Sequence, residues 1–323
     1  MPETIEEELI KEQMVEEQLK EKLLKIPVLN ILIKLLSKVK LPGLVGLSLY
    51  DLLELYIIGI AKGALTARAS AIAYSFFMAL FPFLLFVIIV IPYVPIEDFQ
   101  TDFLMFLESF LPPTTSDFFS DNIFNNIGGN QSGSLVSSVF LLSIFLMANG
   151  INALFSGFEN SYHQILTRNV FKQYIYALGV ALILSILLML TVAFLGYFNI
   201  YVLDNLKDHG FIEKRQVSIW STLAQYGFFV LMVYLATAVL YYFGTAEGKS
   251  SRFFSVGALF TTILIMVTSF LFGIYIENFA KYNELYGSIG AILILLFYLW
   301  LNANILLLGF ELNMSLKQLR KNF

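Results

Sequence analysis

Six long apolar stretches constrain the fold of this chain more than any other feature of its sequence. A helix needs about 20 consecutive apolar residues to cross the hydrocarbon core of a bilayer. The stretches that reach this length lie near residues 70–93, 134–158, 174–198, 218–243, 254–276 and 288–312. Of the 323 residues, 58% are hydrophobic and 14% are charged, whereas soluble domains average about 25% charged residues. We therefore predict an all-α fold, a polytopic membrane protein built as a bundle of six transmembrane helices.

The residues before the first span predict helices that do not cross the membrane. Residues 3–25 pair Glu with Lys at i,i+4 spacing, which supports a solvated helical tail; a partner-binding coiled coil is the alternative. Residues 28–39 carry an apolar stripe at helical spacing, with Lys34 and Lys38 off that stripe. This pattern is typical of a basic amphipathic helix, either on the membrane surface or against the membrane domain.

Residues 47–66 predict an interfacial elbow that leads into the first span. They contain Asp51, Glu54 and Lys62, and a charge at the centre of the bilayer costs about 2.5–3.5 kcal/mol. The domain organisation that we predict is a cytoplasmic tail with an amphipathic helix, a six-span membrane domain and a second cytoplasmic tail, at residues 1–46, 47–315 and 316–323.

The connection at residues 94–133 is long and contains no basic residue. Its first part repeats Phe and Leu at helical spacing beside acidic residues, which predicts a short amphipathic helix on the outer leaflet or over the bundle. Pro112 and Pro113 end that helix, and the sequence GGNQSGS at 128–134 predicts a flexible return into the second span.

Basic residues indicate the orientation of the bundle. Of the 20 Lys and Arg residues, 16 lie on the side of the termini and four on the other side. Short loops rich in Lys and Arg stay in the cytoplasm. We therefore expect both termini to be cytoplasmic, in a bacterial inner membrane.

Small residues recur every fourth position at the start of the first span. The row consists of Gly59, Gly63, Ala67, Ala71, Ser75 and Ala79. Such a row allows a neighbouring helix to approach closely, so we expect it to be the packing face on which the bundle assembles. Pro82 follows within the apolar run and predicts a kink.

Polar side chains inside the second span are candidates for function, because hydrocarbon penalises them. Five polar residues have the spacing that places them on one face of this helix: Asn149, Asn152, Ser156, Glu159 and Asn160. The stripe either lines a polar cavity or hydrogen-bonds neighbouring helices. Tyr74 and Asn304 are further intramembrane candidates for the same polar site.

Arg68 enters the first span from the cytoplasmic side, where the second and sixth spans place Glu159 and Glu311. An unpaired charge at this depth is costly, so we predict that Arg68 pairs with one of these two carboxylates. In the alternative, each side chain extends separately to the interface. The pair would be either a cytoplasmic gate or a purely structural tie.

The sequence offers little for catalysis. It has no cysteine, and its two histidines, His163 and His209, fall on opposite sides of the predicted membrane, where they cannot share a metal. It has no G-x-S-x-G, P-loop or H-E-x-x-H motif and no clustered basic groove. We predict no enzyme activity, no cofactor, no metal and no nucleic-acid partner.

Motifs at the first and last spans resemble the YihY/BrkB family. The first is R-A-x-A-x-A-Y followed by A-L-F-P, at Arg68–Tyr74 and Ala79–Pro82; the last span begins Y-G-S-I-G-A at Tyr286 and ends L-G-F-E-L-N at Asn313. The Asn-rich second span also fits, and the resemblance covers roughly residues 50–315. It implies a six-span bacterial inner-membrane protein. Members of that family were once labelled ribonuclease BN, a misassignment, and others are linked to virulence or to lipid and lipopolysaccharide export.

Three functions are compatible with these observations. The first is transport, export or flipping of an amphiphilic or lipid-linked substrate, with the bilayer as the chain's main partner. The second is a non-transporting membrane scaffold, in which the polar stripe only holds helices together. The third, a membrane-associated ribonuclease, is disfavoured by the missing motifs. A homo-oligomer or a partner protein is compatible with each.

Overall fold

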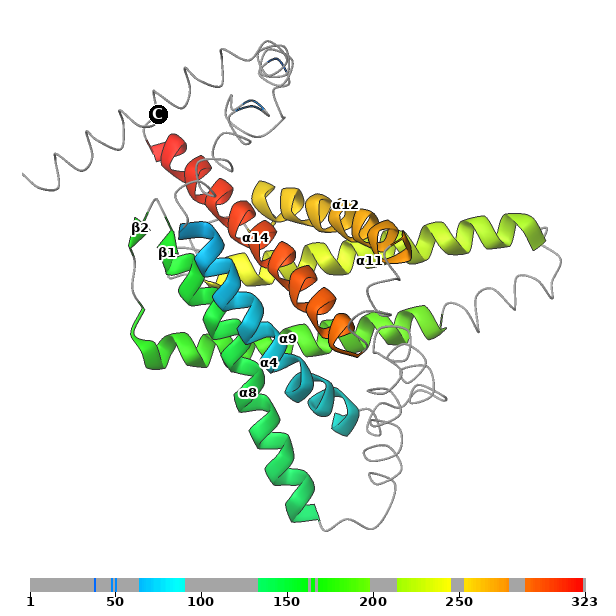
Figure 1. The fold of residues 1–323 in the computed structure, drawn as a ribbon, viewed down its shortest axis with the longest axis horizontal. Coiled ribbons are helices and arrows are strands. Elements are labelled where there is room, and N and C mark those ends of the chain that lie inside the picture. The colour runs from blue at the N-terminus through cyan, green and yellow to red at the C-terminus, as the bar shows by residue number, and fades with distance from the viewer. Residues whose placement is uncertain are drawn as a thin grey trace, which may run out of the picture. The chain divides into compact units, whose positions relative to one another are not determined.

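Six long helices form the part of the chain that the computed structural model describes (Figure 1). The described residues are 38, 48, 50, 64–90, 133–161, 164–165, 168–197, 214–244, 253–278 and 288–321. The helices are α4 (Ala64–Val90), α8 (Gly133–Glu159), α9 (Val170–Tyr197), α11 (Lys214–Gly244), α12 (Val256–Asn278) and α14 (Ser288–Lys321). Each is long and apolar enough to cross a membrane. The predicted all-α, six-span fold is confirmed.

The connection between α8 and α9 contains two strands of two residues each. In this antiparallel pair, β1 (Asn160–Ser161) aligns Asn160 with Ile165 of β2 (Gln164–Ile165). The pair turns the chain directly from the end of α8 towards the start of α9. Asn169 then caps α9, because its Oδ1 accepts from the backbone N–H of Phe171 at 3.1 Å.

The chain divides into two compact units, residues 1–67 with 312–323 and residues 68–311. The boundaries between the units fall inside α4 and α14, and α14 continues to Lys321, beyond the predicted end of the last span near 312. The predicted helix at 3–25, the predicted helix at 28–39 except for Lys38, the amphipathic helix predicted within 94–133, and most of the elbow at 47–66 lie outside the described residues.

Glycines mark the closest approaches between helices in the unit of residues 68–311. A Cβ placed on Gly150 of α8 would lie 2.8 Å from the Cβ of Ala79 in α4, and one on Gly157 would lie 2.7 Å from Cδ1 of Ile72. On α14, a Cβ on Gly309 would overlap the Thr261 hydroxyl of α12 and lie 2.6 Å from the Tyr241 hydroxyl of α11. At these positions the backbone of one helix therefore lies directly against side chains of its neighbours, which is the close packing typical of membrane helices.

An aromatic cluster fills the space between α8, α11 and α14. The ring of Phe158 stacks on Phe310 with centroids 4.2 Å apart, and Tyr241 meets both rings edge-on. The buried Tyr241 hydroxyl is 2.5 Å from Thr261 Oγ1 and donates to the carbonyl of Leu306 at 2.8 Å. A buried hydroxyl in hydrocarbon must find partners within the protein, and this one connects three helices.

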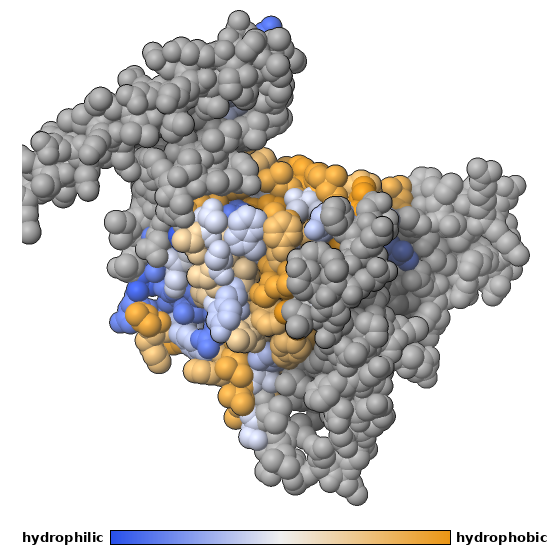
Figure 2. Space-filling view, in the orientation of Figure 1, coloured by the Kyte–Doolittle hydropathy of each residue, from blue (hydrophilic) through white to orange (hydrophobic). Residues whose placement is uncertain are grey.

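Large apolar side chains cover the outside of the described helices. On α8 they include Leu141, Leu142 and Phe145, and on α12 Phe270 and Leu271. Figure 2 shows this apolar surface (orange) on the visible face of the described residues. Helices that are apolar on their outer as well as their inner faces are suited to a lipid environment.

Candidate functional site

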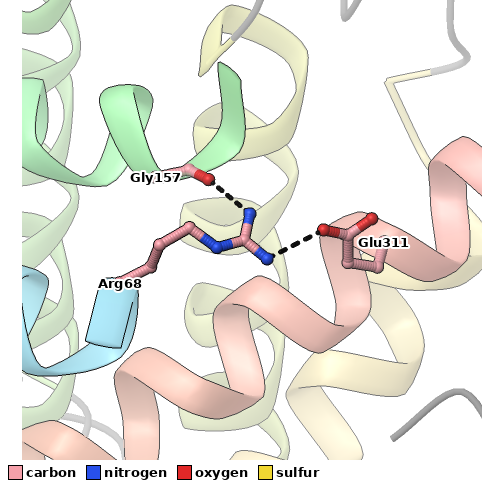
Figure 3. A network of polar contacts seen from close by, with 3 residues as sticks. All are labelled: Arg68, Gly157 and Glu311. Carbon is pink, nitrogen blue, oxygen red and sulfur yellow. Dashed lines mark hydrogen bonds and ion pairs between the residues drawn. The ribbon is translucent and has the colours of Figure 1, made fainter. Parts of the chain in front are cut away.

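One guanidinium group connects three helices at the end where α8 stops (Figure 3). Nη2 of Arg68, in α4, lies 3.2 Å from Oε1 of Glu311 in α14, and Nη1 donates to the carbonyl of Gly157 in α8 at 2.9 Å. The Gly157 carbonyl is available because it lies in the last turn of α8, where carbonyls lack an intrahelical donor. The predicted pairing of Arg68 with Glu159 or Glu311 is confirmed, and the partner is Glu311.

The Arg68–Glu311 pair is largely removed from solvent. The two side chains are 15% and 12% exposed. A guanidinium has several donors in a fixed plane, so Arg68 can bind a carboxylate and a carbonyl at once. Removal of either charge would leave the other largely desolvated without its ion-pair partner, which is costly.

Glu159 is held by the α8–α9 connection instead. Its Oε1 accepts from the backbone N–H of Arg168 at 3.0 Å. The side-chain amide of Gln173, in the first turn of α9, lies 2.9 and 3.0 Å from the two carboxylate oxygens. These contacts satisfy Glu159 without Arg68, which explains why the arginine pairs with Glu311.

Two residues of the predicted polar stripe contact the same amide. The other terminal atom of the Gln173 amide is 3.1 Å from Asn152 Oδ1 and 3.0 Å from Ser156 Oγ. Gln173 is 5% exposed. For Asn152, Ser156 and Glu159 the stripe therefore connects α8 to α9, as the hydrogen-bonding alternative predicts.

Other candidates lie apart from this cluster. Asn149 is exposed on α8, and Asn160 lies in β1. Asn304 is buried in α14, where its amide nitrogen donates to the carbonyl of Trp300 one turn earlier at 2.8 Å. Tyr74 is 60% exposed on α4, so its placement in an internal polar site is wrong: the buried face of α4 runs through Ala69, Ile72 and Ala73, and Tyr74 lies outside it.

The row of small residues is only partly the packing face that we expected. Ala67 and Ala71 are exposed, and Ser75 is half-buried with its hydroxyl donating to the Ala71 carbonyl at 2.9 Å. Ala79 is buried against Gly150. A four-residue spacing advances about 40° around a helix at each step, so the row winds from the outside of α4 into the bundle. Gly59 and Gly63 lie outside the described residues, and α4 continues through Pro82, where the kink stays a prediction.

Arg168 and Gln173 are the site residues that sequence reasoning missed. Nη1 of Arg168 donates to the carbonyl of Phe243, at the end of α11, at 2.7 Å, and its guanidinium lies 4.3 Å from the ring centroid of Tyr176. Burial lowers the pKa of Arg168, against the opposing effects of Tyr176 and Glu159; an arginine keeps its charge at neutral pH even so. Two features of the sequence could have indicated these residues. Arg168 follows Glu159 by only nine positions across a short connection, and Gln173 is a polar residue in the first turn of an apolar span.

Metal binding has no support in this region. Among the residues that the structure describes, no three His, Cys, Asp or Glu side chains gather as a metal site would require. The contacts that the cluster makes are an ion pair and hydrogen bonds.

Comparisons with known proteins point to one membrane family. A model of the virulence factor BrkB family matches residues 59–322. A ribonuclease-like protein of Bacillus subtilis (strain 168), YfkH, is 27% identical over 257 residues, which cover 79% of this chain and 91% of the relative. A UPF0761 membrane protein of Coxiella burnetii (strain Dugway 5J108-111) is 26% identical over 248 residues, 75% of this chain and 84% of the relative. No solved structure matches the chain.

Proposed function

Because the chain belongs to the virulence factor BrkB family of membrane proteins, we propose that it moves an amphiphilic or lipid-linked substrate across the bacterial inner membrane. The observation that carries this proposal is the Arg68–Glu311 pair with its bond to the Gly157 carbonyl. Ionisable side chains within membrane helices are energetically costly and commonly mark substrate or ion pathways.

In this proposal the pair acts as a gate on the cytoplasmic side. Arg68 holds α4 to α8 and to α14, so these helices can separate at this end only if its bonds break. The lipid-facing apolar surface of the helices gives an amphiphile direct access from the bilayer. The sequence contains no ATP-binding P-loop, so the energy comes from the substrate gradient, an ion gradient or a partner protein.

Reconstitution tests the proposal. The full chain is placed in proteoliposomes with a panel of fluorescent phospholipids and lipid-linked sugars, and a membrane-impermeant quencher reports their movement between leaflets. At least one substrate is expected to cross faster than in empty vesicles, and Arg68→Ala is expected to change that rate. The matched control is Ala71→Leu, a substitution on the exposed side of the same helix. Movement equal to that of empty vesicles across the whole panel would count against transport.

A scaffold is the second candidate, and the contacts of Gln173 favour it. Asn152 and Ser156 bond α9 through this amide, as expected of polar groups that serve helix association alone. A scaffold predicts a reproducible protein partner on gentle detergent extraction, and no substrate movement in the vesicles.

A further inference from the structure

One face of α8 carries a row of side chains at the spacing that pairs one helix with another. The row, which we call the α8 seam, consists of Leu142, Leu146, Asn149, Ala153 and Ser156. Its members are separated alternately by four and three residues. This heptad spacing keeps side chains on one side of a helix and is the pattern by which two helices pack along their length. Asn149 is the middle position of the seam.

The centre of the α8 seam is exposed. Leu142 is 57% exposed, Leu146 is 37% exposed, and Asn149 is exposed between them and the half-buried Ala153. Three adjoining positions of a helix-pairing pattern therefore lie on the outside of the described helices.

Two other helices of the chain pack on either side of the seam. On one side, a Cβ placed on Gly150 would lie 2.8 Å from the Cβ of Ala79 in α4. On the other side, Asn152 contacts the side chain of Gln173 in α9 at 3.1 Å. Each residue advances about 100° around a helix, so Gly150 and Asn152 point to opposite sides of Asn149. The seam is the part of α8 that remains open between α4 and α9.

The amide of Asn149 has no hydrogen-bond partner in the part of the chain that the structure describes. Asn149 precedes Glu159, the last residue of α8, by ten residues. This separation is about 15 Å along a helix, or half of the ~30 Å hydrocarbon core of a bilayer. Lipid tails cannot hydrogen-bond an amide, and an unsatisfied polar group in hydrocarbon is energetically costly. The Asn149 amide therefore requires a partner from outside these helices.

A second copy of the chain supplies such a partner at the same depth. The bias of Lys and Arg towards the side of the termini is expected to give every copy the same orientation. A two-fold axis between two such copies is then perpendicular to the membrane, and a residue beside the axis meets the same residue of the other copy. A carboxamide carries both donor hydrogens and an acceptor oxygen, so two Asn149 side chains can exchange a pair of hydrogen bonds. One Asn within an otherwise apolar seam also fixes the register of the two helices.

We propose that the α8 seam is the contact between two copies of this chain, with their Asn149 amides bonded to each other across the two-fold axis. Leu142 and Leu146 pack against their counterparts on one side of this amide pair, and Ala153 lies on the other side. The inference goes beyond the proposed function, because a dimer of this form is compatible with a transporter and with a scaffold.

Cysteine cross-linking in native membranes tests the seam, because the natural chain contains no cysteine. Leu142→Cys and Leu141→Cys change neighbouring residues that are 57% and 66% exposed and point about 100° apart around α8. After mild oxidation, Leu142→Cys is expected to form a disulfide-linked species of twice the chain's mass, because facing seam positions come within disulfide reach. Leu141→Cys is the matched control and is expected to stay uncrosslinked at the same oxidant concentration.

Three results of this experiment would overturn the proposal. Equal cross-linking of Leu142→Cys and Leu141→Cys would indicate random collision. Absence of cross-linking at Leu142→Cys and also at a second seam position, Ala153→Cys, would show that the seam does not face a second copy. A cross-linked species that contains a different protein, identified by mass spectrometry, would assign the seam to that protein.

The dimer equilibrium tests Asn149 itself. Photobleaching of single dye-labelled molecules in vesicles, at decreasing ratios of protein to lipid, gives the dissociation constant of the dimer. Asn149→Leu is expected to raise this constant about tenfold, because a pair of interhelical hydrogen bonds is lost. Asn149→Gln retains a carboxamide and is expected to recover part of that loss. A dissociation constant that is unchanged in Asn149→Leu would exclude the amide pair. These measurements do not involve substrate movement, so their failure and the failure of transport are distinguishable.

Discussion

Arg68 joins α4, α8 and α14 through one side chain, so its contribution to stability is open to a direct test. Arg68→Ala removes the partner of a largely buried carboxylate, and the loss is expected to be about 3–5 kcal/mol. Glu311→Gln is expected to cost less, because Arg68 keeps its bond to the Gly157 carbonyl. The free energies of unfolding are measured in mixed micelles of mild and denaturing detergent.

The double variant decides whether the two side chains act together. Adjacent charged partners are expected to give a coupling energy of about 1–3 kcal/mol, so that the double loss is smaller than the two single losses combined. The matched control combines Arg68→Ala with Phe270→Ala, a substitution of an exposed side chain on α12, for which simple additivity is expected. Additive losses for Arg68 and Glu311 would mean that the pair contributes nothing to stability.

Whether Arg68 pairs with Glu159 or with Glu311 could not be predicted from the sequence. Topology brought Glu159 and Glu311 to the depth of Arg68, and this much could be predicted. The choice depends on the tight pairing of Asn160 with Ile165, which returns the Arg168 N–H and the Gln173 amide to Glu159. Neither hydropathy nor the number of charges predicts this strand pairing. From the sequence, the partner of Arg68 could therefore be restricted to Glu159 or Glu311 but not chosen between them.

Helix α4 shows the same limit at the scale of an element. Its existence follows from an apolar run, but which of its faces is buried depends on its neighbours. Ala71 and Ala79 belong to the same row of small residues, yet Ala71 is exposed and Ala79 is buried against Gly150. The four-residue repeat of small side chains does not by itself predict which of these two alanines is buried.

Matched leucine substitutions test this division of α4. Ala79→Leu forces extra volume against Gly150 and is expected to destabilise the chain by about 1–3 kcal/mol. Ala71→Leu adds apolar surface on the exposed side and is expected to stay within about 0.5 kcal/mol of the unsubstituted chain. The melting temperature in detergent, followed by size-exclusion chromatography, distinguishes the two variants. Equal destabilisation by both would show that the Ala71 face is also packed in solution.

The ends of the elements were less predictable than their centres. Hydropathy marks where a helix leaves the bilayer, whereas the helix itself stops where its backbone finds other partners. Accordingly α14 runs to Lys321 although the apolar stretch ends near residue 312. At the other extreme, Asn169 ends the α8–α9 connection by capping α9, a local signal that is readable in the sequence.

At the scale of the whole molecule, the polar contacts at the end of α8 and the distribution of Lys and Arg along the chain bear on the same question, which is the side of the membrane that a gate would control. Two networks lie at the end where α8 stops: Arg68 of α4 binds Glu311 of α14 and the Gly157 carbonyl of α8. Glu159, at the end of α8, binds the Arg168 N–H and the Gln173 amide of α9, and Arg168 binds the Phe243 carbonyl of α11. From the positive-inside rule we expect this end to face the cytoplasm. A gate at that end would control release to, or entry from, the cytoplasmic leaflet.

Orientation can be measured with single cysteines, because the natural chain contains none to interfere. Lys172→Cys changes an exposed residue in the first turn of α9, on the side expected to face the cytoplasm. Ser132→Cys lies in the sequence of the long connection expected outside. In intact spheroplasts, a membrane-impermeant maleimide is expected to label Ser132→Cys alone, and after lysis it should label both. Labelling of Lys172→Cys in intact cells would show that the orientation is the opposite of the expected one. The proposed Arg68 gate would then lie on the outer side, because Lys172 and Arg68 belong to the same end of the bundle.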